Sequence, residues 1–236
     1  MKNEKLVLLP GLDKQVKFLL EKENVEGMKI LVIGSSSELI ALQLAENSKT
    51  NVDVIVEDYD SFINSRLLLD GADEVNVKVM DFEVTDFDDE SFDLVYAQAS
   101  ITSERRKRII KEIKRLLKPN GIFCVGEIVT LEKEIPNFIN IMFEDSDLEP
   151  MFKGELNDYY LQKNFVINES KNLTHHLFEY YKIGKNKLKE TEKELTDNEK
   201  SYYKKLLKKT SHETNVFLKH GAEKYVGFQA LIMRKK

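Results

Sequence analysis

The chain has 236 residues, and its 36 basic and 41 acidic side chains leave a formal net charge of −5. That length suits one α/β domain with an elaborated cap, and no run approaches the roughly 20 apolar residues that a membrane-spanning helix needs. A single cysteine excludes an internal disulfide and any multi-cysteine zinc or iron–sulfur site. A cytoplasmic protein is the simplest expectation.

Charge is spread unevenly along the chain. Residues 1–152 hold 18 basic and 30 acidic side chains, whereas residues 153–236 hold 18 and 11. A basic C-terminal part can attract an anionic partner, but lysine-rich solvated helices explain the same numbers. The acidic N-terminal two thirds disfavours nucleic acid as a partner.

Short apolar runs alternate with helical periodicities through the first half of the chain. The patterns predict helices at 12–25, 39–45, 62–69 and 103–118, and buried strands at 28–34, 52–56, 75–80, 92–97 and 122–126. Strands that alternate with helices pair in parallel with right-handed crossovers. The predicted fold class is therefore α/β, a Rossmann-like doubly wound sheet with its ligand at the carboxyl ends of the strands.

The helix at 103–118 has the clearest predicted boundaries. Ser103 is placed to cap its first turn, and Glu104 faces the positive end of the helix dipole. Pro119-Asn120-Gly121 stops the helix before the next strand.

The pattern changes in the second half. Strands are predicted at 165–167 and 225–233, and the roughly fifty residues between them are mostly helical and highly charged. Long insertions in compact domains are often functional. We therefore expect a single domain over residues 1–236, with 177–218 inserted as a helical lid.

Residues 79–95, VMDFEVTDFDDESFDLV, form the most informative passage: an apolar run ends on Asp81 and Phe82, and a second run follows an acidic loop. This passage resembles the one between strands three and four of class I S-adenosylmethionine (SAM)-dependent methyltransferases, in particular those of ubiquinone and menaquinone biosynthesis. Residues 116–123, LLKPNGIF, are similar to the turn before strand five of that family. The resemblance covers about residues 12–130 and the terminal strand, and it implies that the last strand is antiparallel.

The resemblance assigns cofactor-binding roles to residues at the strand ends. Asp81 would accept a hydrogen bond from the adenine amino group, and Phe82 would cover the adenine ring. Glu57, with Asp58 next to it, follows strand two, where the family places an acid that binds both ribose hydroxyls. A carboxylate suits that role because its two oxygens accept hydrogen bonds side by side.

The glycine loop departs from the family pattern. Of its three glycines only Gly34 is present; Ser36 and Glu38 stand at the other two positions, and Val32 replaces the usual acid. Ser35 and Ser36 are still small, and their amides and hydroxyls at a helix N-terminus could hold the cofactor's carboxylate. Glu38 either pairs with the cofactor's ammonium group or is a helix-start residue favoured by the dipole.

Methyl transfer from SAM does not require a set of catalytic residues. It is an in-line displacement from an activated sulfonium, so the protein chiefly positions the acceptor and excludes water. Gln98, just beyond strand four, and Glu127, near the end of strand five, are the candidates for acceptor contacts, and Gln98 is also a candidate for the cofactor. His175-His176 lacks a convergent carboxylate motif, so no metal site is predicted.

Three hypotheses remain open from the sequence. The leading one is a SAM-dependent methyltransferase acting on a small molecule, with a protein acceptor as the variant. The second is a methyltransferase-like binding or assembly subunit that has lost catalysis, which the eroded glycine loop supports. The third is an NAD(P)-dependent oxidoreductase, suggested by Gly34-Ser35-Ser36-Ser37 and by the spacing of Tyr159 and Lys163. The acceptor and the oligomeric state are not readable.

Overall fold

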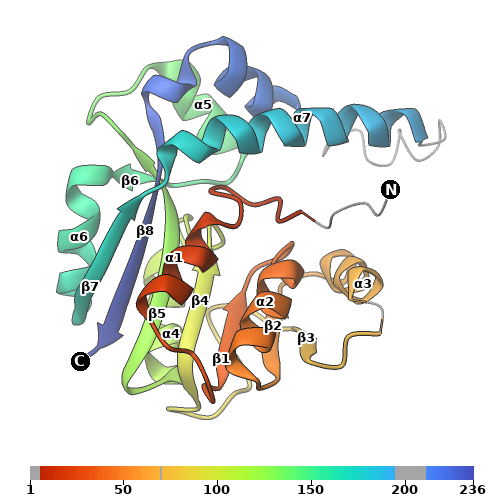
Figure 1. Cartoon of the computed structure of the whole chain (residues 1–236). Helices are drawn as coiled ribbons and strands as arrows, with labels where there is room; N and C mark the ends of the chain where they lie inside the picture. The colour runs from red at the N-terminus through yellow and green to blue at the C-terminus, as the bar shows by residue number, and fades with distance from the viewer. Residues whose placement is uncertain (1–5, 70, 195–210) are drawn as a thin grey trace.

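A single mixed sheet organises the molecule (Figure 1). The computed structural model describes residues 6–69, 71–194 and 211–236. The sheet has eight strands in the order β3-β2-β1-β4-β5-β8-β7, and the short β6 pairs with β5. The strands are β1 (Ile30–Ile33), β2 (Val52–Val56), β3 (Val75–Val79), β4 (Phe92–Gln98), β5 (Leu117–Thr130), β6 (Met151–Phe152), β7 (Phe165–Asn172) and β8 (Val226–Lys235).

Strand direction follows the prediction. β3, β2, β1, β4 and β5 run parallel, whereas β8 is antiparallel to both of its neighbours, β5 and β7. The predicted doubly wound sheet with an antiparallel last strand is confirmed.

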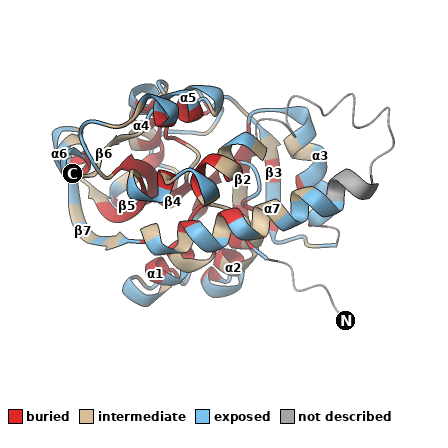
Figure 2. Ribbon diagram, turned by 90° about the horizontal axis from the view of Figure 1, so that it is seen from above, coloured by how far each residue is buried: buried red, intermediate tan, exposed pale blue. Residues whose placement is uncertain are grey.

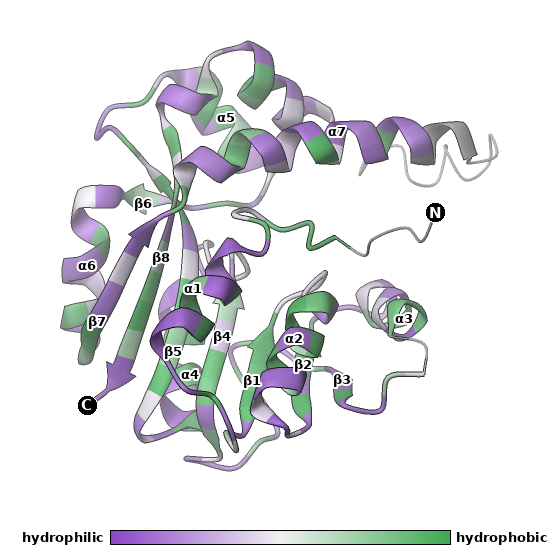
Figure 3. Cartoon of the chain, in the orientation of Figure 1, coloured by the Kyte–Doolittle hydropathy of each residue, from purple (hydrophilic) through white to green (hydrophobic). Residues whose placement is uncertain are grey.

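Helices cover both faces of the sheet. They are α1 (Lys14–Lys22), α2 (Glu38–Ser48), α3 (Tyr59–Leu68), α4 (Arg106–Leu116), α5 (Asn137–Asp145), α6 (Lys153–Gln162) and α7 (Leu177–Glu194), and residues 211–219 are also helical. The pleat sends alternate side chains of the inner strands to opposite faces, so Val32 joins the core with α1 and α2, and Leu31 joins the core with α4 and α6. The inner strands are accordingly apolar and buried (Figures 2 and 3).

Several boundaries differ from the prediction. α4 begins at Arg106, three residues later than expected, and Ser103 does not cap it; the Ser103 carbonyl accepts the Arg106 amide in a preceding turn. α5 and α6 were not predicted, because the acidic residues around 143–152 obscured an apolar face of Ile139, Met142 and Phe143. Within the predicted insertion, α7 and 211–219 are helical, and residues 195–210 lie outside the described part.

The N-terminal segment packs against the start of the last strand, β8. Gly11 has φ +83°, and a Cβ there would lie 2.6 Å from Cε1 of Phe228 on the last strand. The Gln15 amide on α1 donates to the carbonyl of Ala97 on β4 at 3.0 Å. The N-terminal segment therefore closes over strands that include β8, the last strand of the sheet in chain order. α7 runs across the top of the molecule in Figure 1, with this segment between it and the sheet.

Candidate functional site

Parallel pairing brings the predicted cofactor residues to one edge. Ile33 is in register with Ile55, and Val56 with Val79, so β1, β2 and β3 end side by side. Gly34, Glu57 and Asp81 each follow one of these ends within two residues. The sheet thus assembles residues that are up to 47 positions apart in sequence.

Gly34 lies where a side chain has no room. Its φ is +123°, and a Cβ would approach the Cβ of Ser100 to 2.6 Å. The Ser100 hydroxyl donates to the Ile33 carbonyl at 2.6 Å, which fixes it against the loop. Ser36, at the position of the second family glycine, has a left-handed φ of +61°. Ser35 and Ser36 are exposed just before α2 begins.

Both carboxylate oxygens of Glu57 accept hydrogen bonds within the protein. Its Oε1 accepts the Phe82 amide at 3.1 Å and Arg105 Nη2 at 2.8 Å, while Oε2 accepts Arg105 Nη1 at 2.9 Å. Asp58 has a different role, since it caps α3. The Ser61 amide and hydroxyl both donate to its carboxylate at 2.7 Å, which holds the pKa of Asp58 below its ordinary value.

Asp81 and Phe82 present a carboxylate and a ring from the next strand end. Asp81 Oδ1 accepts the Glu83 amide at 2.8 Å and Arg105 Nη2 at 2.6 Å. Among the described residues Oδ2 accepts no hydrogen bond, and the side chain is 60% exposed. Phe82 is buried and packs in the core layer of α4.

Glu38 points toward α3 rather than into open solvent. It is 5% exposed and accepts a hydrogen bond from the Ser65 hydroxyl. It also lines a cavity of about 240 Å³ that the two loop serines share with Lys187 of α7. The lining residues are Leu6, Leu8, Ser35, Ser36, Glu38, Leu39, Ser61, Asn64, Leu68 and Lys187.

Gln98 is buried and holds the N-terminal segment. Its Nε2 donates to the carbonyls of Pro10 at 2.7 Å and Leu12 at 2.8 Å, and its Oε1 accepts the Tyr96 hydroxyl at 2.5 Å. The alternation of β4 puts Gln98 on the same face as Tyr96, toward α1. In the described structure this amide does not reach the cavity beside Glu57.

Glu127 is completely buried in a polar cluster. Its carboxylate accepts the hydroxyls of Thr102 at 2.6 Å and Tyr160 at 2.5 Å, and it pairs with Arg106 at 3.1 Å. Arg106 also donates to the Glu149 carbonyl at 2.5 Å. Burial, followed by the charge of Glu127, raises the pKa of Tyr160 well above its ordinary value. The cluster therefore fastens the loop containing Glu149 to β5.

A cavity of about 620 Å³ lies beside Glu57. Its walls come from three strand ends, the start of α4 and the loop after α5. They are Glu57, Phe82, Ser100, Ser103, Glu104, Arg105, Ile109, Asp147, Leu148 and Glu149.

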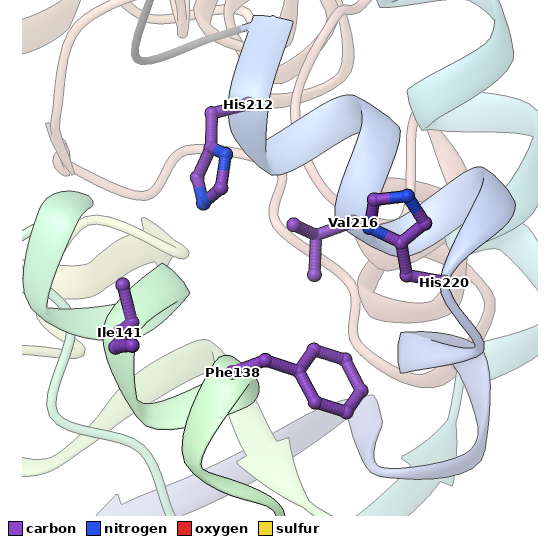
Figure 4. Close-up of a pocket in the computed structure, with 5 residues that line it drawn as sticks. All are labelled: Phe138, Ile141, His212, Val216 and His220. Atoms are coloured by element: carbon purple, nitrogen blue, oxygen red, sulfur yellow. The ribbon is translucent and has the colours of Figure 1, made fainter.

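A separate cavity of about 310 Å³ lies between α5 and residues 211–220. Figure 4 shows Phe138 and Ile141 of α5 on one side, facing His212, Val216 and His220. It contains none of the predicted site residues, all of which are in the described part of the chain. No group of three or more His, Cys, Asp or Glu in that part is arranged to hold a metal ion, and none of its helices is long and apolar enough to cross a membrane.

Arg105 is the main site residue that the sequence reasoning missed. A signal was present, because Arg105, Arg106 and Arg108 cluster at the start of a helix, where the dipole disfavours cations. Such cations require nearby acids. Glu57, Asp81, Glu83 and Glu127 supply them from three different strand ends, which a local pattern does not reveal.

Sequence comparison now adds an independent observation. Residues 31–125, from β1 into β5, match the methyltransferase domain family. Over this segment the chain is similar to a methyltransferase domain. No curated protein matches the chain in sequence.

Solved structures agree on the fold. A proposed sarcosine dimethylglycine methyltransferase from Galdieria sulphuraria superposes with TM-score 0.75 at 14% identity, covering 94% of this chain and 84% of that one. The phosphoethanolamine N-methyltransferase 2 of Haemonchus contortus, bound to phosphomonomethylethanolamine and S-adenosylhomocysteine, gives 0.76 at 13%, covering 94% and 53%. The cyclase SpnF gives 0.75 at 16%, covering 94% and 80%.

The family match supports the prediction of a methyltransferase over residues 31–125, and the solved structures confirm the Rossmann-like fold predicted for it. The narrower resemblance to the ubiquinone and menaquinone enzymes stays a prediction. So do the individual cofactor contacts.

Proposed function

We propose that this methyltransferase acts on a small molecule bound in the cavity of about 620 Å³. The main support is that Glu57, Phe82 and Ser100, from three strand ends, line that one cavity, and Ser100 lies against Gly34. The volume falls within the range of about 300–1,000 Å³ that is usual for small-molecule sites. A concave site of this volume favours a small acceptor over a protein acceptor.

The residues around the cavity fit the adenosyl part of SAM. Glu57 offers two oxygens for the ribose hydroxyls, Asp81 an oxygen for the adenine amino group, and Phe82 an apolar wall. Residue 34 is a glycine, so the loop carries no side chain there; a Cβ at this position would collide with Ser100. When bound, SAM supplies a methyl group that is activated on its sulfonium.

The protein's own work is to position the acceptor and exclude water. The wall at Leu148 and Glu149 is held by Arg106 and by the Thr102 carbonyl, which accepts the Glu149 amide at 3.2 Å. Since Glu127 is buried behind this wall, we assign it a positioning role. Gln98 supports the N-terminal segment that lies over the strand ends.

The same geometry supports a second candidate, a methyltransferase-like subunit without catalysis. Arg105 occupies both oxygens of Glu57, and Val32 stands where the family has an acid. A ligand must therefore compete with an internal partner for the ribose position.

Calorimetric titration with SAM, S-adenosylhomocysteine and NADPH separates these functions. We expect both adenosyl compounds to bind and NADPH to be silent. Glu57→Gln should weaken S-adenosylhomocysteine about tenfold or more, because it removes a charged acceptor. The control is Glu26→Gln, which alters an exposed ion pair with Lys49 on the opposite side of β1. Equal affinity in the wild type and Glu57→Gln would contradict the proposed site, and binding without methyl transfer would favour the second candidate.

A further inference from the structure

Arg105 connects the two acids that the cofactor is expected to use. Its guanidinium makes a two-point contact with Glu57, at 2.8 and 2.9 Å, and Nη2 also lies 2.6 Å from Asp81. Its Nε donates to Glu83. One side chain thus occupies the acceptors of two neighbouring strand ends.

The carboxylate of Glu57 has too few acceptor positions to bind Arg105 as it does and both ribose hydroxyls at the same time. Each carboxylate oxygen accepts about two hydrogen bonds. Oε1 is filled by the Phe82 amide and Arg105, and Oε2 has one position left. Two ribose hydroxyls need one position on each oxygen, so Arg105 must release Oε1 before a ribose can bind both.

Arg105 is placed so that it can move. It is the residue that precedes α4, its side chain is 30% exposed, and no side-chain cap fixes that end of the helix. The helix dipole disfavours a cation there, so the acids hold it. Glu83 contacts Nε, whereas Glu57 contacts Nη1 and Nη2, so Glu83 remains a partner after release.

We propose that Arg105 is an internal competitor for the cofactor: it holds Glu57 when the site is empty of nucleoside, and the ribose displaces it. This inference rests on the proposed function. Arg105 thus lowers the affinity for the cofactor, although it is not one of the residues that hold the cofactor. The energy needed to separate the ion pair is subtracted from the binding energy of the ribose.

The experiment is titration of S-adenosylhomocysteine into the wild type, Arg105→Met, Arg105→Lys and Arg108→Met, at about 50 mM and 500 mM salt. S-adenosylhomocysteine carries no net charge, so salt acts mainly on the protein's own ion pairs. Arg108 is the matched control, because it contacts Glu83 but not Glu57.

We expect Arg105→Met to bind about fivefold more tightly than the wild type, equivalent to about 1 kcal/mol. Arg105→Lys should fall between them, because lysine cannot form the two-point contact. Added salt should tighten binding to the wild type and leave Arg105→Met unchanged. Arg108→Met should match the wild type.

Weaker binding by Arg105→Met would show that Arg105 belongs to the cofactor site itself, and equal binding would show that it does not compete. Either result overturns the inference while the wild type still binds. If neither the wild type nor any folded variant binds S-adenosylhomocysteine, the proposed function fails, and the inference fails with it. Thermal unfolding of each variant establishes that it is folded.

Discussion

The φ of +61° at Ser36 stores strain in the cofactor loop. A residue with a Cβ is disfavoured in this region by about 1–2 kcal/mol, whereas glycine is not. Glycine also costs entropy on folding, which offsets part of that gain.

Ser36→Gly should therefore stabilise the protein by about 0.5–1 kcal/mol in urea unfolding. The matched control is Ser35→Gly in the same exposed loop, where φ is negative and the expected change is a loss of about 0.5–1 kcal/mol. Changes of the same sign at the two positions would contradict a conformational origin.

Among the individual site residues, the sequence predicted some positions correctly and missed others. Gly34 and Glu57 were found because they directly follow apolar strands, whose ends a parallel sheet must align. Gln98 was predicted just beyond a strand, but it is the last residue of β4, and the two-residue alternation turns it toward the N-terminal segment. The role of Arg105 depends on a turn before α4 that no periodicity marks.

At the scale of elements, α4 is tied to the acidic loop after β3 through Glu112. This side chain is 8% exposed; the Thr85 amide and hydroxyl donate to it at 2.8 and 2.7 Å, and Arg115 at 2.6 Å. Burial alone would raise the pKa of Glu112, but the hydrogen bonds from Arg115 and Thr85 outweigh it. The pKa consequently lies below the ordinary 4.5.

Because the folded pKa of Glu112 is depressed, its contribution to stability is present above about pH 4.5 and is lost as the pH falls through the folded pKa. Urea unfolding at pH 7 and at pH 3.5 should show Glu112→Gln to be less stable than the wild type by about 1–3 kcal/mol at pH 7, with a smaller difference at pH 3.5. The exposed Glu46→Gln on α2 is the control. A constant difference at both pH values would contradict the linkage.

The sequence predicted buried helices and strands more accurately than exposed ones. β2 was placed at its observed limits because all but one of its residues are buried. α6 buries Leu156 and Tyr160, but most of its other residues are polar. β6 has only two residues, so it is too short to show an alternating apolar pattern. The apolar signal that distinguishes an element from a loop is weak in such peripheral segments.

At the scale of the whole molecule, α7 contacts both the helix at residues 211–219 and the small cavity beside the glycine loop. Its Tyr181 stacks on Phe217 with ring centroids 4.2 Å apart, and its hydroxyl donates to Glu213 at 2.7 Å. Farther along, Lys187 lines the small cavity with Ser35 and Ser36. The start of the helix is thus anchored, and its middle, at Lys187, borders the cofactor loop.

The proposed lid role of this region predicts a local response. S-adenosylhomocysteine should slow amide hydrogen exchange in residues 183–190, which border the loop, because closure lowers the population of locally open states. Residues 177–182, anchored at Tyr181, serve as the internal control. Equal exchange in 183–190 with and without ligand would leave α7 as scaffold.

The closure of the N-terminal segment on Phe228 has a consequence for synthesis on the ribosome. Gly11 packs on a strand that is translated more than two hundred residues later. Contacts between distant parts of a chain must wait for the later partner. A stalled nascent chain ending before β8 should therefore leave this segment open to proteolysis, and completing β8 should seal the strand ends on which the cofactor site is built.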